Sequence, residues 1–236
     1  KFGIKSPLGK HLSLALGTSG LAPLEIASAY SVIANLGIYN EPYLIQQIED
    51  FQGNRLYEHF YQGVQQFSPD TLYPLLDMMQ GVIERGTGRV IRRMGFRHPA
   101  AGKTGTTNNF KDAWFNGFTK DLSTTVWVGF DNNDSMRTKS GKGLTGASAA
   151  APVWVHFMQK ALEGKTMVKF PVPENIKFEK VDIETGRLPG EFSREKMEVA
   201  VKDDIDLSPL PKLNKGLENN TEISKEPETF IDSSDQ

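Results

Sequence analysis

The stretch that decides the fold runs from residue 99 to residue 131 and reads PAAGKTGTTNNFKDAWFNGFTKDLSTTVWVGFD. It contains three strand candidates, at about 101–106, 113–118 and 124–130. The link between the last two is short enough for an antiparallel hairpin. The third strand alternates branched or aromatic side chains with Trp127 and Gly129, so both of its faces are apolar or small. This pattern predicts an antiparallel sheet that is covered on both sides.

Helices are expected on either side of this stretch. Pro23 suits the first turn of a helix that Gly37 ends. Ser68-Pro69 begins a second helix, with one apolar face made of Leu72, Leu75, Leu76, Met79 and Ile83. The remaining expected elements are a hairpin within 43–58 that turns at Gln52-Gly53-Asn54, a short helix over 88–94, a glycine-rich loop over 131–145 and an apolar helix over 147–162. Helix pairs, an antiparallel sheet and a closing helix predict the α+β class.

Composition excludes several classes of protein. The 236 residues are 38% hydrophobic, have a formal net charge of −2 and include no cysteine. The charge argues against binding to nucleic acid, and the lack of cysteine excludes disulfides and Cys-ligated zinc. No apolar run approaches the length of about 20 residues that a transmembrane helix needs, so no membrane contact is expected from this chain itself. The four histidines lack metal-ligand spacing, and no cofactor is expected.

The chain divides into three parts by composition. Residues 1–168 carry the alternating helix and strand signals. Residues 169–201 form an extension that is interrupted by Pro171, Pro173 and Pro189. Residues 202–236 contain nine acidic residues and four lysines, a net charge of −5, and one aromatic residue. Such a segment buries too little apolar surface to offset its chain entropy, so we predict a disordered acidic tail.

One short motif carries chemistry: Lys103-Thr104-Gly105-Thr106, preceded by Gly102. A phosphate-binding loop requires four residues between its two glycines, whereas six separate Gly95 from Gly102, so nucleotide binding is rejected. The remaining interpretation is the K-T-G triplet of serine acyl-transferases.

The residue types of this triplet suit the edge of a strand. Lys103 supplies a cation, and the hydroxyls of Thr104 and Thr106 can hold a substrate carboxylate. Gly105 has no side chain, so a substrate backbone can approach closely. The Thr106 N–H can point at a developing oxyanion, where one donor is typically worth roughly 3 kcal/mol in the transition state. A K-T-G triplet occurs by chance in many sequences, so the triplet alone is weak evidence. The residues around it make this interpretation more specific.

That context resembles class A (bifunctional) penicillin-binding proteins. The segments PAAGKTGTT at 99–107, DAWFNGFT at 112–119 and TTVWVGFD at 124–131 are similar to the family's third active-site motif and the two strands after it. The segments at 13–37, 81–90 and 146–162 are similar to neighbouring parts of the same transpeptidase domain, in the family's order. The chain therefore resembles the C-terminal part of that domain over roughly its first two thirds.

The resemblance implies a fold, a reaction and partners. The fold would be a penicillin-recognising, β-lactamase-like domain with a central antiparallel sheet flanked by helices. In the family a serine attacks the penultimate D-Ala carbonyl of a peptidoglycan stem peptide, releases the last D-Ala and passes the acyl group to an amine. β-Lactam antibiotics mimic the D-Ala-D-Ala end. The resemblance gives substrate and oxyanion binding to Lys103, Thr104, Gly105 and Thr106. It also implies an extracytoplasmic location, with a glycosyltransferase domain and a membrane anchor in the parent protein.

Two motifs of the family are absent from this sequence. Only Ser193 is followed by lysine three places later, at Lys196, and it comes after the K-T-G instead of before it; no Ser-x-Asn occurs. We interpret Ser193 as a surface coincidence. Serine acyl transfer needs a nucleophile with an adjacent base, so this chain is expected to be inactive alone and to need an N-terminal half. Without that half, we expect an apolar sheet face to be exposed.

Two alternatives stay open at this point. A related serine hydrolase, a D,D-carboxypeptidase or a β-lactamase, could share the two strands after the triplet. A non-catalytic binding module with a decayed active site is the alternative from another class. The intact Lys103-Thr104-Gly105-Thr106 argues against long decay.

Overall fold

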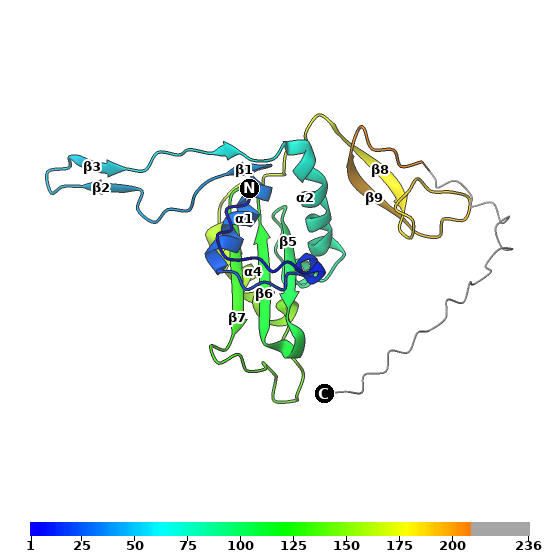
Figure 1. Cartoon of the computed structure of the whole chain (residues 1–236), viewed down its shortest axis with the longest axis horizontal. Helices are drawn as coiled ribbons and strands as arrows, with labels where there is room; N and C mark the ends of the chain where they lie inside the picture. The colour runs from blue at the N-terminus through cyan, green and yellow to red at the C-terminus, as the bar shows by residue number, and fades with distance from the viewer. Residues whose placement is uncertain (209–236) are drawn as a thin grey trace, which may run out of the picture.

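The computed structural model describes residues 1–208. Its centre is a three-stranded antiparallel sheet, in the order β5-β6-β7, made of β5 (Ala101–Thr106), β6 (Asp112–Phe118) and β7 (Ser123–Gly129). Figure 1 shows helices beside this sheet and a two-stranded hairpin at either side of the body. The fold is α+β, and the three strands lie where the sequence predicted them, within one residue at each end.

The helices also match the prediction. They are α1 (Pro23–Ala34), α2 (Pro69–Glu84), α3 (Val90–Arg93) and α4 (Ala151–Ala161). Before α4 the chain makes a wide turn, η3 (Gly146–Ala150), whose first residues are capped by the Thr145 side chain. Short elements complete the body: the 3-10 turns η1 (Leu12–Leu16) and η2 (Asn108–Phe110), and the strand pair β1 (Ile38–Tyr39) and β4 (Val64–Gln65).

The strand register divides the sheet into two faces. Thr104 is opposite Phe115, and Phe115 is opposite Val126, so these three side chains share one face. Gly105, Trp114 and Trp127 are opposite one another in the next row and share the other face. We call the face of Phe115 the packed face and the face of Trp114 the open face.

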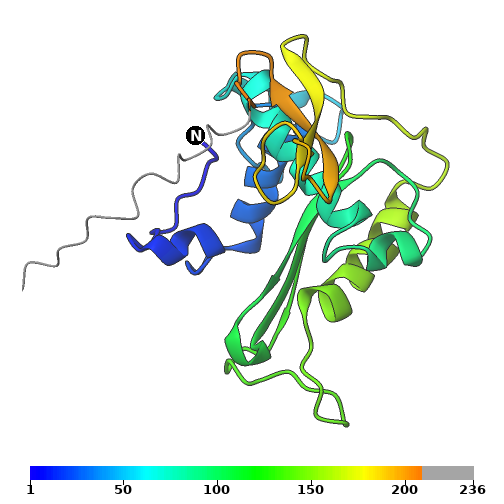
Figure 2. The same ribbon diagram turned by 90° about the vertical axis from the view of Figure 1, so that its right-hand side faces the viewer.

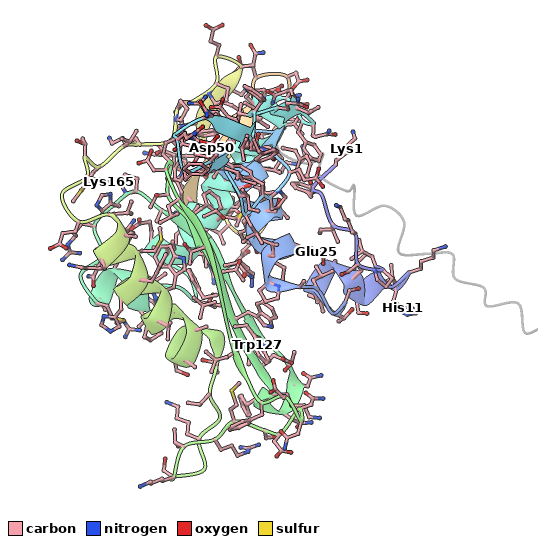
Figure 3. The ribbon with its side chains drawn as sticks, turned by 90° about the vertical axis from the view of Figure 1, so that its left-hand side faces the viewer. Lys1, His11, Glu25, Asp50, Trp127 and Lys165 are labelled. Atoms are coloured by element: carbon pink, nitrogen blue, oxygen red, sulfur yellow. The ribbon has the colours of Figure 1, made fainter. Side chains whose placement is uncertain are left out.

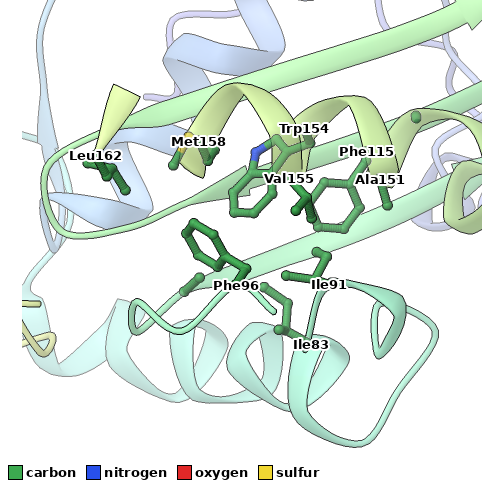
Figure 4. Close-up of a cluster of buried hydrophobic side chains, with 11 residues drawn as sticks. Ile83, Ile91, Phe96, Phe115, Ala151, Trp154, Val155, Met158 and Leu162 are labelled. Atoms are coloured by element: carbon green, nitrogen blue, oxygen red, sulfur yellow. The ribbon is translucent and has the colours of Figure 1, made fainter. Parts of the chain in front are cut away.

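The packed face holds the main hydrophobic core. Trp154 of α4 is fully buried, and its ring meets those of Phe96 and Phe115 edge to face, with centroids 5.1 and 5.2 Å apart. Figure 4 shows these rings together with Ile83 of α2 and Ile91 of α3. The indole N–H of Trp154 donates to Gly117 O at 3.2 Å, so burial leaves this polar group satisfied.

The open face is covered over only part of its area. Helix α1 packs there, with Tyr30 against Phe118 and with Ala27 O accepting a hydrogen bond from Ser123 Oγ at 3.0 Å. Figure 3 shows Trp127 on the part of the sheet that extends past α1, and 37% of this residue is exposed. The predicted cover on both sides therefore holds for the packed face and only partly for the open face.

The first hairpin, β2 (Gln47–Glu49) with β3 (Arg55–Glu58), was predicted, although its first strand is shorter than expected. It extends away from the body, as Figure 1 shows at the left, and leaves large apolar side chains such as Leu44, Phe51 and Phe60 exposed.

The second hairpin, β8 (Ile176–Asp182) with β9 (Lys196–Lys202), was not predicted. It packs beside α2, as Figure 2 shows. Ala200 N donates to Asp77 Oδ2 at 3.1 Å, and Lys202 pairs with Asp70 at 3.0 Å. The alternation of apolar and charged residues in both strands was a usable signal, but the neighbouring prolines concealed it.

The boundaries predicted at 168/169 and 201/202 stay predictions. Residues 202–208 of the proposed tail are described, and Leu207 O accepts a hydrogen bond from Leu188 N at 2.7 Å. The rest of the tail, 209–236, lies outside the described residues. Within residues 1–208, the helices are all too short or too polar to cross a membrane.

Candidate functional site

The Lys103-Thr104-Gly105-Thr106 motif occupies strand β5. Among the described residues β5 pairs only with β6, so its other side is a free edge. Short connections place it there: α2 and α3 lead into β5, and the η2 turn returns the chain into β6. The sequence therefore located the motif correctly at the rim of an antiparallel sheet.

The backbone direction along β5 follows from one hydrogen bond. Thr107 N donates to Asp112 O on β6 at 3.1 Å. Because the N–H and C=O groups of alternate residues in an antiparallel strand point to opposite sides, those of Gly105 also face β6. Those of Thr104 and Thr106 face the free edge. An extended peptide or a developing oxyanion at this edge would meet the Thr106 N–H and the Thr104 C=O.

Lys103 brings a positive charge to the same edge. Its side chain is exposed, and its Nζ donates to Thr104 O at 2.8 Å. An ammonium group has three donor protons, so two remain for water or for an anionic ligand. The lysine therefore bends over the edge instead of extending into solvent.

Both threonine hydroxyls of the motif are engaged from the side of the packed face. Thr106 Oγ1 accepts from Gly146 N at 3.0 Å, at the start of η3. Thr104 Oγ1 is 2.7 Å from Thr87 Oγ1, in the turn that follows α2. The sequence interpretation named neither partner as a site residue. The glycines on both sides of Thr87 were the available signal.

The contact between Gly146 N and Thr106 Oγ1 requires a glycine at position 146. A Cβ atom at this position would overlap Trp114 O and lie 2.6 Å from Gly105 O. The chain before α4 therefore rests directly on the β5–β6 backbone, and only glycine permits that approach.

A row of polar side chains crosses the open face beside the motif. Lys103 is opposite Asn116, and Asn116 is opposite Thr125. In the described part of the chain, Asn116 Oδ1 and Thr125 Oγ1 are buried and make no hydrogen bond. Burial raises the pKa of the neighbouring Tyr30 hydroxyl, and the polar side chain of Asn116 opposes this rise. Two buried oxygens that have no hydrogen-bond partner among the described residues lower the stability of the fold.

Ser193 and Lys196 lie in the β8–β9 hairpin, not on the central sheet. Ser193 Oγ accepts from Gly190 N at 3.0 Å. The hydrogen bond from the Ser193 hydroxyl, together with neighbouring backbone donors, lowers the pKa of Asp182. This serine is thus engaged in the hairpin's own turn, in agreement with its interpretation as a coincidence of sequence.

One arginine of the short helix α3 also has a structural role. Arg92 pairs with Glu84 at 2.6 Å and donates to the carbonyls of Phe96 and His98 at 2.9 Å. Within residues 1–208, there is no cluster of three or more residues of the kinds that hold a metal ion.

A cation, two hydroxyls and a backbone N–H at one strand edge are all hydrogen-bond donors, which suits an anionic ligand. Comparison with known proteins identifies the family to which the chain belongs. The model of the penicillin binding protein transpeptidase domain matches residues 5–159. The chain therefore belongs to the penicillin-binding protein transpeptidase family.

Its relatives within that family are class A proteins. Penicillin-binding protein 1A of Neisseria lactamica is 42% identical over 183 residues, which is 75% of this chain and 22% of the relative. Penicillin-binding protein 1A of Pseudomonas aeruginosa is 35% identical and covers 79% of this chain and 28% of the relative. This chain thus corresponds to part of the transpeptidase domain of class A penicillin-binding protein 1A, and spans about a quarter of those relatives.

Solved structures of penicillin-binding proteins are similar to this chain as well. The crystal structure of penicillin-binding protein 1A from Haemophilus influenzae has a TM-score of 0.74 and 29% identity, covering 89% of this chain and 36% of that one. PonA1 from Mycobacterium tuberculosis, in complex with penicillin V, has a TM-score of 0.62 and 28% identity, covering 72% of this chain and 50% of that one.

Proposed function

We propose that this chain is the substrate-binding half of a serine-type peptidoglycan D,D-transpeptidase. In this proposal the free edge of β5 binds the D-Ala-D-Ala end of a stem peptide, and also the β-lactams that imitate it. The main observation in favour of this proposal is that the backbone N–H and C=O groups of Thr104 and Thr106 face the free edge of β5. At this edge Lys103 Nζ lies 2.8 Å from Thr104 O. The family match favours this function over a carboxypeptidase, a β-lactamase or a non-catalytic module.

Each residue of the motif has a proposed task. The Lys103 ammonium and the hydroxyls of Thr104 and Thr106 hold the terminal carboxylate, because charge-assisted hydrogen bonds to an anion are the strongest kind available here. The Thr106 N–H stabilises the oxyanion that forms when the penultimate D-Ala carbonyl is attacked. Gly105 keeps the strand narrow, so that the substrate backbone can lie against it.

The attacking half of the reaction is proposed to come from a part of the polypeptide that this sequence does not contain. The Ser-x-x-K and Ser-x-Asn motifs are absent from the 236 residues. The uncovered area of the open face offers a place for that half, since Trp127 is exposed there. From the resemblance to class A penicillin-binding proteins, we also propose that the reaction takes place outside the cytoplasmic membrane, to which the N-terminal part would anchor the protein.

Binding can be tested on the chain itself. We expect N-acetyl-D-Ala-D-Ala to shift the amide resonances of residues 103–106 in an isotope-labelled sample, and the same peptide with a C-terminal carboxamide to leave them unchanged. Lys103→Met should weaken binding about tenfold, because it removes a charged donor. Lys165→Met, in the exposed loop after α4, is the matched control. Equal shifts from both peptides would refute a carboxylate site.

Catalytic incompleteness needs a second experiment. Incubation with a fluorescent penicillin should give no covalent band with the purified chain, because a nucleophile with an adjacent base is missing. The same chain extended upstream to include a Ser-x-x-K motif should be labelled. A band with the unextended chain that disappears when a single serine is replaced would overturn this part of the proposal.

A further inference from the structure

Thr87 contacts the motif from outside strand β5. It lies in the turn Gly86-Thr87-Gly88, which follows α2, and its Oγ1 is 2.7 Å from Thr104 Oγ1. This distance is typical of a good O–H···O hydrogen bond, and either oxygen can be the donor. Thr87 is exposed and belongs to no hydrophobic core, so core packing does not account for its position.

The turn that carries Thr87 is fixed to the end of α2. Gly86 N donates to Gly81 O, and Gly88 N donates to Val82 O, each at 2.9 Å. A Cβ atom on Gly86 would lie 2.8 Å from Val82 Cα, and one on Gly88 would lie 3.1 Å from Val82 O. Both glycines therefore let the turn press against α2, whose Leu76 and Ile83 are fully buried. The backbone on both sides of Thr87 is thus fixed to the end of the helix.

The two threonines of the motif are supported in the same way. Thr106 Oγ1 accepts a hydrogen bond from Gly146 N at 3.0 Å, which leaves its own proton free. If Thr87 donates to Thr104 Oγ1, the Thr104 proton is free as well. A hydroxyl that accepts a hydrogen bond becomes a better donor, because the bonds of a chain polarise one another. Both protons would then be available to the two oxygens of one carboxylate.

We propose that Thr87 is a positioning residue that holds the Thr104 hydroxyl with its proton directed at the carboxylate of the bound stem peptide. The inference rests on the proposed function, since it assumes that β5 binds a carboxylate. In the free chain the Thr87–Thr104 bond runs in either direction, and the anion selects the direction Thr87 to Thr104 to carboxylate. The geometry gives Gly146 N the equivalent task for Thr106.

The first test concerns the side chain of Thr104 and needs no ligand. Three-bond couplings from Thr104 Cγ2 to the carbonyl carbon and to the amide nitrogen report its χ1 angle. We expect one rotamer in the unaltered chain and in Thr87→Ser, which keeps the hydroxyl. We expect rotamer averaging in Thr87→Val, which has nearly the same shape without the hydroxyl.

The second test measures affinity for N-acetyl-D-Ala-D-Ala. Thr87→Val should weaken binding about five- to tenfold, the usual effect of one hydrogen bond, whereas Thr87→Ser should stay within about twofold. On a Thr104→Val background, Thr87→Val should have no further effect, because the hydroxyl it serves is gone. Thermal unfolding by circular dichroism should be unchanged by Thr87→Val, because the residue is exposed.

The outcomes separate the two ideas. No binding by the unaltered chain would refute the carboxylate site, and with it the proposed function. Normal binding by Thr87→Val, with Thr104 still in one rotamer, would refute only the role of Thr87. Equal losses in Thr87→Val and Thr87→Ser would show a purely steric role for the side chain and would also overturn the inference.

Discussion

Both the packed and the open face of the central sheet carry large aromatic residues, but only on the open face do some of them stay partly exposed. On the packed face Phe115 is fully buried under Trp154. On the open face Trp127 is 37% exposed, although it lies on the neighbouring strand and is hydrogen-bonded through its indole to Asp112 at 2.9 Å. An aromatic residue in a strand therefore indicates that its side chain can be covered by other residues, but does not tell whether this chain supplies them.

The difference has a functional consequence. The packed face anchors the elements that support the motif from behind, namely the α2 turn with Thr87 and the η3 turn with Gly146. The open face leaves Lys103 exposed beside buried oxygens that lack partners in the described chain. One side of the sheet thus supports the motif, and the other is partly uncovered where we propose that the attacking half of the site lies.

The largest contrast should come from removing one tryptophan on each face. Trp154→Ala should lower the free energy of unfolding by about 3–5 kcal/mol, because it leaves a large cavity in the main core. Trp127→Ala should cost about 1 kcal/mol or less, because its ring is already partly solvated. Urea unfolding followed by circular dichroism measures both. Similar losses at the two positions would mean that the open face is as well packed as the other.

The next effect concerns the seam between η3 and the sheet. Gly146→Ala should destabilise the chain by about 1–3 kcal/mol, because the added methyl group meets backbone atoms that cannot move aside easily. It should also weaken binding of the D-Ala-D-Ala peptide by displacing the Thr106 hydroxyl. Gly20→Ala is the control, since no atom lies within 4 Å of its added Cβ. Unchanged stability and affinity in Gly146→Ala would argue against this support.

Two neighbouring threonines on β7 provide a finer comparison. Thr125→Val should stabilise the isolated chain by about 1 kcal/mol, since it removes a buried hydroxyl that has no partner in the described residues. Thr124→Val, on the packed face, loses a hydrogen bond to Met158 Sδ at 3.2 Å and should be neutral or slightly destabilising. The denaturation midpoints of the two variants and of the unaltered chain measure these differences in stability. A loss of stability in Thr125→Val would show that its hydroxyl is already satisfied, for example by water.

The smallest effect should appear in the pH dependence of the folding stability. It concerns Glu25 of α1, the helix that covers part of the open face. Glu25 accepts from Ser6 Oγ at 2.6 Å and from the N–H groups of Lys5 and Ser6 at 2.8 Å, and these bonds lower its pKa to about 2. Since the folded pKa lies below the unfolded value, the contribution of Glu25 is fully present above pH 4.5. It is lost as the pH falls towards 2.

The measurement is the stability difference between the unaltered chain and Glu25→Gln. This difference should be constant from pH 7 to 5 and should shrink between pH 4.5 and 2. Glu41→Gln, which breaks the exposed ion pair with Lys5, should show little difference at any pH. A difference for Glu25→Gln that grows in acid would contradict the assigned direction of the pKa shift.

Local signals predicted much of the fold. Proline at the first turn and glycine after the last turn fixed the position of α1, and apolar spacing fixed that of α2. The strands β5 to β7 were recognisable because each is bounded by turn residues. The β8–β9 hairpin was missed, since its strands alternate apolar with charged residues and follow two prolines, a composition that also suits a solvated extension.

The sequence by itself determined the family, the α+β class and the four motif residues, because these depend on residue type and short spacing along the chain. Only the tertiary structure decided which atoms support them. Thr87 meets Thr104 across 17 positions and Gly146 meets Thr106 across 40, and no local pattern encodes such encounters. They arise where helices and strands pack, and packing depends on the whole chain at once.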